Sequence, residues 1–340
     1  MPCLDGMPRI VNQAFRRPNL FLKECALMNQ QIASPGSSLV VRTIPFDLDA
    51  ALRGNGRFGP YWFDDKGIAY LAIGYSFALE YSERFINLAD TVLPNFINDG
   101  SLRKQESTFN HQEANHAKYH RILNEMVAPT PPTSEKYNPR VYDFFYSNYK
   151  TFREPLMQRL FEPQDERELM GAVNETMFRR AAFETVTCIT GLTYFDFLFD
   201  EGRLTETLSA TRTPAVLYLF GYHLAEELEH CTTAFDVYDS IFHEPMWSQQ
   251  SIAQVFGNPA QSIDHEINSA AFFVAKHAGQ ELSLSELQNN AFAKRQREIQ
   301  AEMIAPGFHP GRGACKERKD YFVAKWDREW EPILRDRIAA

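Results

Sequence analysis

Two Glu-x-x-His sequences, each inside a long helical stretch, constrain this chain more than any other feature. The first is Glu113-Ala-Asn-His116 and the second is Glu227-Leu-Glu-His230. Residues three positions apart lie on the same face of an α-helix, so each motif projects one carboxylate and one imidazole together. Such a pair can bind one metal ion, and its carboxylate can bridge to a second ion.

Hydrophobic periodicity places both motifs in a set of four long helices. The predicted helices span residues 68–96, 101–126, 165–199 and 214–242. The turn signal Asn98-Asp99-Gly100 ends the first helix, and Ser101 is the expected N-cap of the second. Because this connection is short, the two helices are expected to pack antiparallel.

The rest of the chain is expected to surround this set of helices. Residues 1–60 form an N-terminal arm packed on the bundle, with a candidate short strand at 38–44, and residues 61–340 form a single domain. A proline-rich loop at 128–139 leads into a short helical piece at 141–160. Two or three further helices follow residue 242, and the loop 306–313 precedes a terminal amphipathic segment.

Each motif-bearing helix is preceded by a helix that carries an acid in an apolar setting. These acids are Glu83, preferred to Glu80 one turn earlier, and Glu184, which lies beside Phe183 and Val186. The order Glu, Glu-x-x-His, Glu, Glu-x-x-His is the ligand arrangement of ferritin-like di-iron and di-manganese bundles. The predicted fold is therefore an all-α, ferritin-like four-helix bundle with flanking helices and an N-terminal arm.

The charge of this ligand set indicates which metals it suits. Four ionised glutamates in a core need compensation, and two divalent ions supply it. Oxygen-rich ligands with imidazole favour iron or manganese, whereas structural zinc favours thiolates and calcium does not use histidine. The expected cofactor is two iron ions, with a manganese/iron pair as the alternative.

Further histidines lie on the motif-bearing faces. His223 precedes Glu227 by four residues and is predicted as a seventh ligand, whereas His120 follows His116 by four and is predicted to orient a ligand from outside the set. Glu226 lies close to the same face, and Glu229 is expected to point to solvent. The remaining histidines have no matching partners and are interpreted as surface or capping residues: His111, His243, His265, His277 and His309.

Composition excludes several other classes of protein. A formal net charge of −9 gives no support for nucleic-acid binding. The five cysteines are scattered without a CxxC pair, which argues against a disulfide framework and a thiolate zinc site. No signal peptide begins the sequence, and the longest uncharged apolar stretch, 68–79, is shorter than the roughly 20 residues of a membrane span. A cytoplasmic protein is expected, and no nucleophile elbow, P-loop or dinucleotide fingerprint is present.

Several segments resemble the family of predicted metal-dependent hydrolases. They are VRTIPFDLD (41–49), SERFI (82–86), QEANHAKYHRILN (112–124), HLAEELEHCTTAFDVYD (223–239) and PGFHP (306–310). The ligand pattern is also similar to that of the p-aminobenzoate N-oxygenase family of di-iron enzymes, with His223 at the position of an extra metal-binding histidine. This second resemblance implies a seven-ligand set of Glu83, Glu113, His116, Glu184, His223, Glu227 and His230.

The expected function is that of a non-haem di-iron oxygenase, with N-oxygenation of an amine as the leading reaction. Such an enzyme needs a small-molecule substrate, O2 and an external electron donor. A dinuclear metal-dependent hydrolase is the first alternative. A hydroxylase or desaturase acting on C–H bonds and a metal-storage protein are the others, and a homodimer is compatible with such a bundle.

Overall fold

The computed structural model describes residues 39, 41–53, 62–127, 139–256 and 263–339. Throughout these residues the protein is helical, and an isolated bridge between Phe63 and Thr211 is the one β-type pairing recorded there. The prediction of an all-α fold is confirmed. The candidate strand at 38–44 is wrong for its described residues, 39 and 41–44, which have no strand partner.

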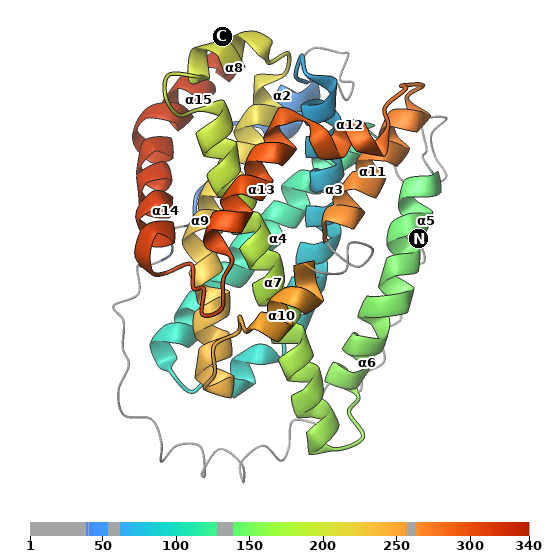
Figure 1. Cartoon of the computed structure of the whole chain (residues 1–340), viewed down its shortest axis with the longest axis vertical. Helices are drawn as coiled ribbons and strands as arrows, with labels where there is room; N and C mark the ends of the chain where they lie inside the picture. Colours follow the sequence, from blue (N-terminus) through green and yellow to red (C-terminus); the bar gives the residue numbers. More distant parts are fainter. Residues whose placement is uncertain (1–38, 40, 54–61, 128–138, 257–262, 340) are drawn as a thin grey trace.

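Four long helices run alongside one another and form the centre of the molecule (Figure 1). They are α3 (Lys66–Ala89), α4 (Gly100–Val127), α7 (Glu166–Leu198) and α9 (Pro214–Phe242). Their buried aromatic and aliphatic side chains form a large main core and a second, smaller cluster, as expected for helices with apolar residues on several faces. The predicted bounds of the third and fourth helices agree with the structure within one residue.

The first two helices differ from their predicted bounds at their shared connection. Helix α3 ends at Ala89, and a separate 3-10 turn, η3 (Leu93–Phe96), contains Pro94, whose ring cannot continue an α-helix. The N-terminal amides of α4 are capped by Asp99, whose Oδ1 accepts a hydrogen bond from the Leu102 amide at 2.8 Å. The prediction of Ser101 as the N-cap is therefore wrong; Ser101 lies inside the helix.

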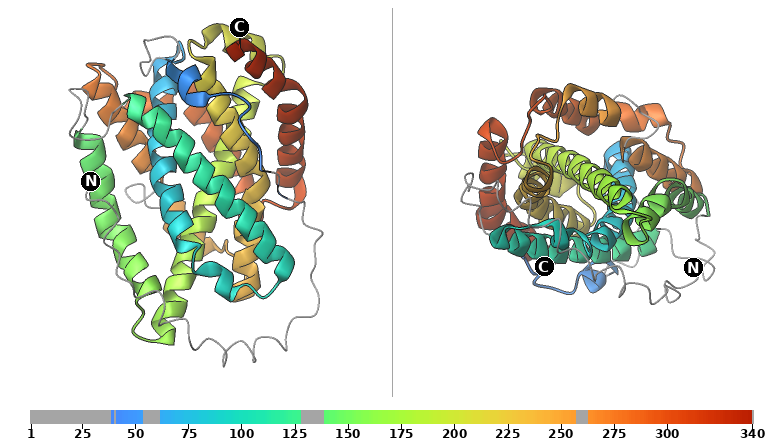
Figure 2. Two further views of the ribbon diagram at one scale, coloured as in Figure 1. Left: turned by 180° about the vertical axis from the view of Figure 1, so that it is seen from behind. Right: turned by 90° about the horizontal axis from the view of Figure 1, so that it is seen from below.

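Shorter helices surround the bundle. In Figure 2, the bundle helix α4 lies on one side of the molecule and the chain after α9 lies on the other. The shorter helices are α2 (Leu48–Arg53), α5 (Pro139–Asn148), η4 (Tyr149–Arg153), α6 (Glu154–Phe161), α8 (Leu204–Ala210), α10 (Gln249–Phe256), α11 (Ile263–His277), α12 (Leu284–Asn289), α13 (Ala291–Met303), α14 (Gly313–Lys325), η6 (Trp326–Trp330) and α15 (Glu331–Ala339). Four helices, rather than the expected two or three, lie between α9 and the loop at 306–313.

Two glycines allow flanking segments to approach the bundle closely. A Cβ atom at Gly74 of α3 would lie 2.2 Å from the Ile267 carbonyl oxygen of α11. A Cβ atom at Gly221 of α9 would lie 2.3 Å from the indole of Trp326 in η6. Because glycine has no side chain, these two positions allow α11 and the C-terminal helices to pack directly against the bundle.

The described part of the N-terminal segment lies against α9 and the C-terminal helices. Ile44, Leu48 and Leu52 are buried in the main core, and the Phe46 ring contacts that of Tyr218 at 4.9 Å. The predicted boundary of an N-terminal arm at residue 60 lies outside the described residues, and it stays a prediction.

Candidate metal centre

The seven residues predicted as ligands meet in the middle of the bundle. Helix α3 supplies Glu83, α4 supplies Glu113 and His116, α7 supplies Glu184, and α9 supplies the rest: His223, Glu227 and His230. All seven side chains are completely buried. We refer to these seven residues as the Glu/His cluster.

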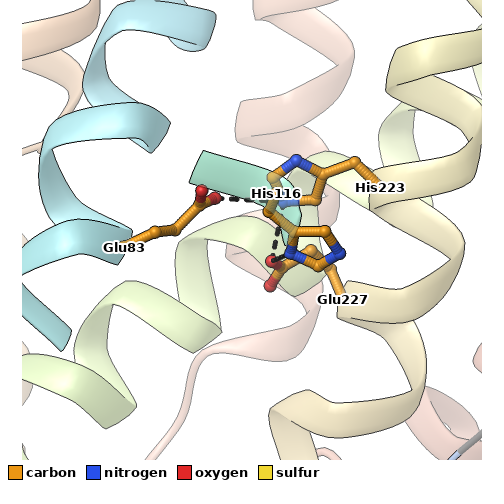
Figure 3. A group of neighbouring side chains, drawn as sticks. All are labelled: Glu83, His116, His223 and Glu227. Atoms are coloured by element: carbon orange, nitrogen blue, oxygen red, sulfur yellow. Dashed lines mark hydrogen bonds and ion pairs between the residues drawn. The ribbon is translucent and has the colours of Figure 1, made fainter. Parts of the chain in front are cut away.

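One half of the Glu/His cluster is formed by Glu83, His116, His223 and Glu227 (Figure 3). One ligand atom from each of the four lies within 4.8 Å of the others. His223 Nε2 is 2.7 Å from Glu227 Oε1 and 3.3 Å from Glu83 Oε1. His116 Nδ1 is 3.4 Å from the same Glu227 oxygen. These nitrogen and oxygen atoms surround a point where one ion could bind.

The other half is formed by Glu113, His116, Glu227 and His230, whose ligand atoms also lie within 4.8 Å of one another. His230 Nε2 is 3.1 Å from Glu113 Oε1 and 3.5 Å from Glu227 Oε1. Glu184 adds a carboxylate oxygen 3.2 Å from His230 Nδ1. Because Glu227 and His116 belong to both halves, the two candidate ion positions are adjacent.

The cluster leaves many buried polar atoms without hydrogen bonds. Both carboxylate oxygens of Glu83, Glu113 and Glu184 have no hydrogen-bond partner, nor do Glu227 Oε2 and the two ring nitrogens of His230. Leaving such groups buried and unpaired costs about 1–3 kcal/mol each, and more where they are charged. Divalent cations would satisfy these donor atoms, so the residues fit a dinuclear metal centre.

Protonation within the cluster reflects its burial. Desolvation raises the pKa values of Glu83, Glu113 and Glu184 well above the ordinary range, and repulsion from neighbouring carboxylates adds to this. Desolvation also lowers the pKa of His223 to about 4 and of His230 to about 3, so both imidazoles are neutral at physiological pH. Neutral imidazole is the form that binds metals.

His116 is oriented by a carboxylate outside the cluster. Its Nε2 lies 2.8 Å from Glu226 Oε2, which leaves Nδ1 directed at Glu227 and Glu113. Although burial opposes a positive charge, the hydrogen bond to Glu226 raises the pKa of His116 to about 10. Glu226 in turn accepts a hydrogen bond at 2.7 Å from the backbone amide of Arg42. The N–H of a metal-binding histidine is commonly held by a carboxylate in this way.

Arg42 also joins two distant parts of the chain on the surface of α9. Its guanidinium donates to Glu229 at 2.6 and 2.8 Å and to Asp327 at 3.0 and 3.1 Å. Glu229 is therefore engaged in an ion pair and only partly exposed, and the prediction that it points freely to solvent is wrong.

His223 is oriented by a chain of buried hydrogen bonds that begins at His120. His223 Nδ1 lies 2.6 Å from His120 Nε2, and His120 Nδ1 lies 2.9 Å from Ser76 Oγ. Ser76 donates to Asn124 Oδ1, and Asn124 donates to Glu80 Oε2. The structure thus places His120 beside the cluster, and it places Glu80 at the far end of this chain rather than among the candidate ligands.

Arg180 lies one turn before Glu184 on α7 and holds together buried residues beside the cluster. Its guanidinium binds Glu106 at 2.6 and 2.7 Å and Asp90 at 3.1 Å, and all three side chains are buried. It also lies over the Phe109 ring, 3.9 Å from the centroid, and that ring packs edge-on against His230. Sequence reasoning missed this triad, as well as the role of Glu226, because neither follows a recognisable spacing.

The other histidines lie away from the cluster. His111, His243, His265 and His277 are exposed, as expected. His309 is buried, with Nδ1 accepting from the Gly311 amide at 3.1 Å and Nε2 lying 3.4 Å from Asp236. Its interpretation as a surface residue is therefore wrong. Cys188, Cys231 and Cys315 are free, buried thiols outside the cluster.

Both Glu-x-x-His motifs lie in a region that matches a known protein family. Residues 41–313 match the family described as "Predicted metal-dependent hydrolase". The chain belongs to this family. The matched region contains all seven residues of the Glu/His cluster, together with Arg42, Glu226 and Arg180. Comparison with curated proteins and with solved structures found no significant match.

None of the described helices of this family member is long and apolar enough to cross a membrane. The family description and the cluster together indicate a metal-dependent enzyme, and the reaction is considered below.

Metal binding is expected to stabilise the protein more strongly as the pH rises. The pKa values of Glu83, Glu113 and Glu184 are raised in the metal-free fold, so these groups favour folding fully below their unfolded pKa values and lose that contribution as pH rises through the folded values. Burial acts to raise the pKa of Glu227, but hydrogen bonds from His116 and His223 help to lower it well below its usual value, so this one group opposes the trend. Ions bind the deprotonated forms.

The measurement is thermal unfolding with and without two equivalents of Mn(II) between about pH 5 and pH 8. The metal-dependent increase in Tm should grow across this range. An increase that is constant, or larger in acid, would contradict ligation by these carboxylates.

Proposed function

We propose that this protein is a non-haem di-iron oxygenase that activates O2, with N-oxygenation of an amine as its reaction. The supporting observation is the fully buried set of four glutamates and three histidines, divided into two adjacent groups that share Glu227 and His116. A net charge of −4 from the glutamates balances two divalent ions and also tolerates their oxidation. This donor set suits iron or a manganese/iron pair.

Each residue of the Glu/His cluster has a defined role in this proposal. Glu83, Glu113, Glu184 and Glu227 would hold the two ions through their carboxylates, with Glu227 placed in both groups. His116, His223 and His230 would supply nitrogen ligands. A hydrogen bond with Glu226 orients His116, and one with His120 orients His223. When bound, the two irons supply electrons to O2, and an external donor restores them.

The surrounding protein would protect this chemistry from water. The cluster is completely buried, and the aromatic rings of Phe109 and Tyr222 contact His230 and His116. Exclusion of water limits side reactions of activated oxygen and strengthens the electrostatic interactions of the site. His223 adds a third nitrogen ligand, which is the feature that the cluster shares with the ligand pattern of the p-aminobenzoate N-oxygenase family.

Hydrolysis is the main alternative because the family description names it. In that reaction the ions would lower the pKa of a bound water and polarise an ester, amide or phosphoryl group. C–H hydroxylation or desaturation would use the same ligands and O2 but a different substrate. Storage of metal would instead require uptake of more than two irons per chain.

The deciding experiment compares two metals and two atmospheres. The protein is loaded anaerobically with two equivalents of Fe(II), mixed with O2 in the presence of ascorbate and a panel of amines, and followed by O2 consumption and product mass. Zinc-loaded protein is assayed anaerobically with ester and phosphoester substrates. Iron- and O2-dependent addition of oxygen to an amine is expected. Hydrolysis that persists with zinc and without O2 would transfer the assignment to a hydrolase.

A further inference from the structure

A large cavity lies between the bundle and the helices that follow α9. Its volume is about 980 Å³, near the upper end of the range of small-molecule sites. Residues of α3, α7, α9, α11 and α13 line it. In Figure 1, α13 lies over α7 and α11 lies beside α3. The walls of the cavity are therefore bundle helices on one side and flanking helices on the other.

The cavity follows the bundle over about two to three helical turns. Its lining runs from Ile68 to Tyr75 on α3, from Thr190 to Leu198 on α7, and from Phe292 to Ala301 on α13. At 1.5 Å per residue these stretches are about 10, 12 and 14 Å long. A cavity of this length and volume is wide as well as long, so a single-ring molecule would leave much of it empty.

The cavity lies near the Glu/His cluster, but the seven cluster residues are not among those that line it. Leu224 lines it and directly follows His223 on α9. Tyr75 and Thr190 line it about two helical turns from Glu83 and Glu184 on α3 and α7. Tyr75 is 6 % exposed, and its hydroxyl, beside Thr190, makes no hydrogen bond of ordinary length and angle. A buried polar group is therefore available in the cavity wall.

Polar residues form the opening of the cavity to solvent. Asp264, His265, Gln288, Asn289 and Arg297 line the cavity and are exposed. The remaining walls are mainly apolar and buried, with Leu71, Leu198, Phe220 and Phe292 among them. The cavity therefore combines a polar opening with apolar walls and a buried hydroxyl at Tyr75.

We propose that this cavity is the substrate site and that it takes a molecule with an apolar chain, whose polar reacting end lies against Tyr75. The substrate class rests on the proposed function only in naming an amine as the reacting group. An alkylamine is protonated near neutral pH, so its ammonium group would donate a hydrogen bond to the unpaired Tyr75 hydroxyl oxygen.

Binding to zinc-loaded protein tests this site without any oxygen chemistry. The probes are n-decylamine and n-butylamine, measured by calorimetry below the concentration at which decylamine forms micelles. Burial of the longer chain predicts at least about tenfold tighter binding of decylamine. Equal affinities for the two amines would overturn the proposal.

Substitutions in the cavity wall test whether decylamine binds in this cavity. Ala72→Trp fills the cavity from α3 and should weaken decylamine binding at least about tenfold. Ala301→Trp on α13 serves the same purpose if Ala72→Trp does not fold, and Ala278→Trp, at an exposed position outside the cavity, is the matched control. Tyr75→Phe should weaken the binding of decylamine several-fold and leave n-decane binding unchanged. Unaltered decylamine binding in both cavity-filling variants would exclude this cavity.

The outcomes separate the two proposals. Decylamine binding that depends on Ala72 and Tyr75, in a protein that does not react with O2, would retain the cavity as the ligand site and remove the oxygenase assignment. Reaction with O2 without chain-length-dependent binding would do the reverse.

Discussion

Replacing Glu227 with glutamine is expected to abolish stable binding of the metal pair and all activity that depends on it. Glu227 belongs to both halves of the Glu/His cluster, and its Oε1 lies within 3.5 Å of ring nitrogens of His116, His223 and His230. Glutamine keeps the shape of the side chain but removes the charge that would bridge two cations. Glu83, Glu184, His223 and His230 each belong to one half, so substitutions there affect one ion position first, whereas this one affects both.

Thermal unfolding and metal content measure this effect. A ligand present at 100 times its Kd stabilises the folded state by about 2.7 kcal/mol, so the wild-type protein should gain several degrees in Tm with Mn(II). Glu227→Gln should gain nothing while retaining its helical circular dichroism spectrum. Glu229→Gln, two residues along the same helix and paired with Arg42, is the control and should respond as the wild type does. Normal metal binding by Glu227→Gln would remove this residue from the proposed centre.

Replacing Arg180 with methionine is expected to destabilise the fold by about 3–5 kcal/mol, because it leaves two buried carboxylates without their cation. Asp90 and Glu106 both depend on this guanidinium, and burial already raises the pKa of Asp90 well above its ordinary value. In the variant Asp90 should bind its proton more tightly than in the unfolded chain. The loss of folding stability relative to the wild type should therefore increase as pH rises, because a group whose pKa is raised in the folded state loses its stabilising contribution in that direction.

Arg179 provides a neighbouring control for this prediction. It pairs with Glu175 on the surface of the same helix, where an ion pair contributes at most about 1 kcal/mol. Urea unfolding should give Arg179→Met a midpoint close to that of the wild type and Arg180→Met a much lower one. Equal midpoints for the two variants would show that the buried triad does not support the bundle.

The positions of the candidate ligands could be predicted because they depend on the helical repeat. Once apolar periodicity identified the four long helices, the i, i+3 spacing placed Glu113 with His116 and Glu227 with His230 on single faces. Glu83 and Glu184 followed from the one-acid-per-helix order, and His223 from its spacing to Glu227. These inferences needed only local geometry and the number of helices.

Residues that act through distant partners could not be predicted in this way. Arg180 meets Glu106 and Asp90 across 74 and 90 residues of sequence, and the Arg42 amide meets Glu226 across 184. Such pairings depend on how the helices are arranged around one another, and no spacing within one helix encodes that arrangement. The same reason explains why the cavity between α13 and the bundle had no signal in the sequence.

The local errors have a different origin. The first helix was predicted to continue to residue 96, but it ends at Ala89, and Asp99 rather than Ser101 caps the next helix. Turn residues such as Asn98, Asp99 and Ser101 all favour helix starts, and tertiary packing selects among them.

The most direct test of the central claim is the metal content of the wild-type chain. The protein is loaded anaerobically with excess Fe(II), freed of unbound metal and subjected to elemental analysis. A buried dinuclear centre predicts two irons per chain, retained through gel filtration and released on acidification as the glutamates bind protons. Retention of no iron, or of a single iron at saturation, would contradict it.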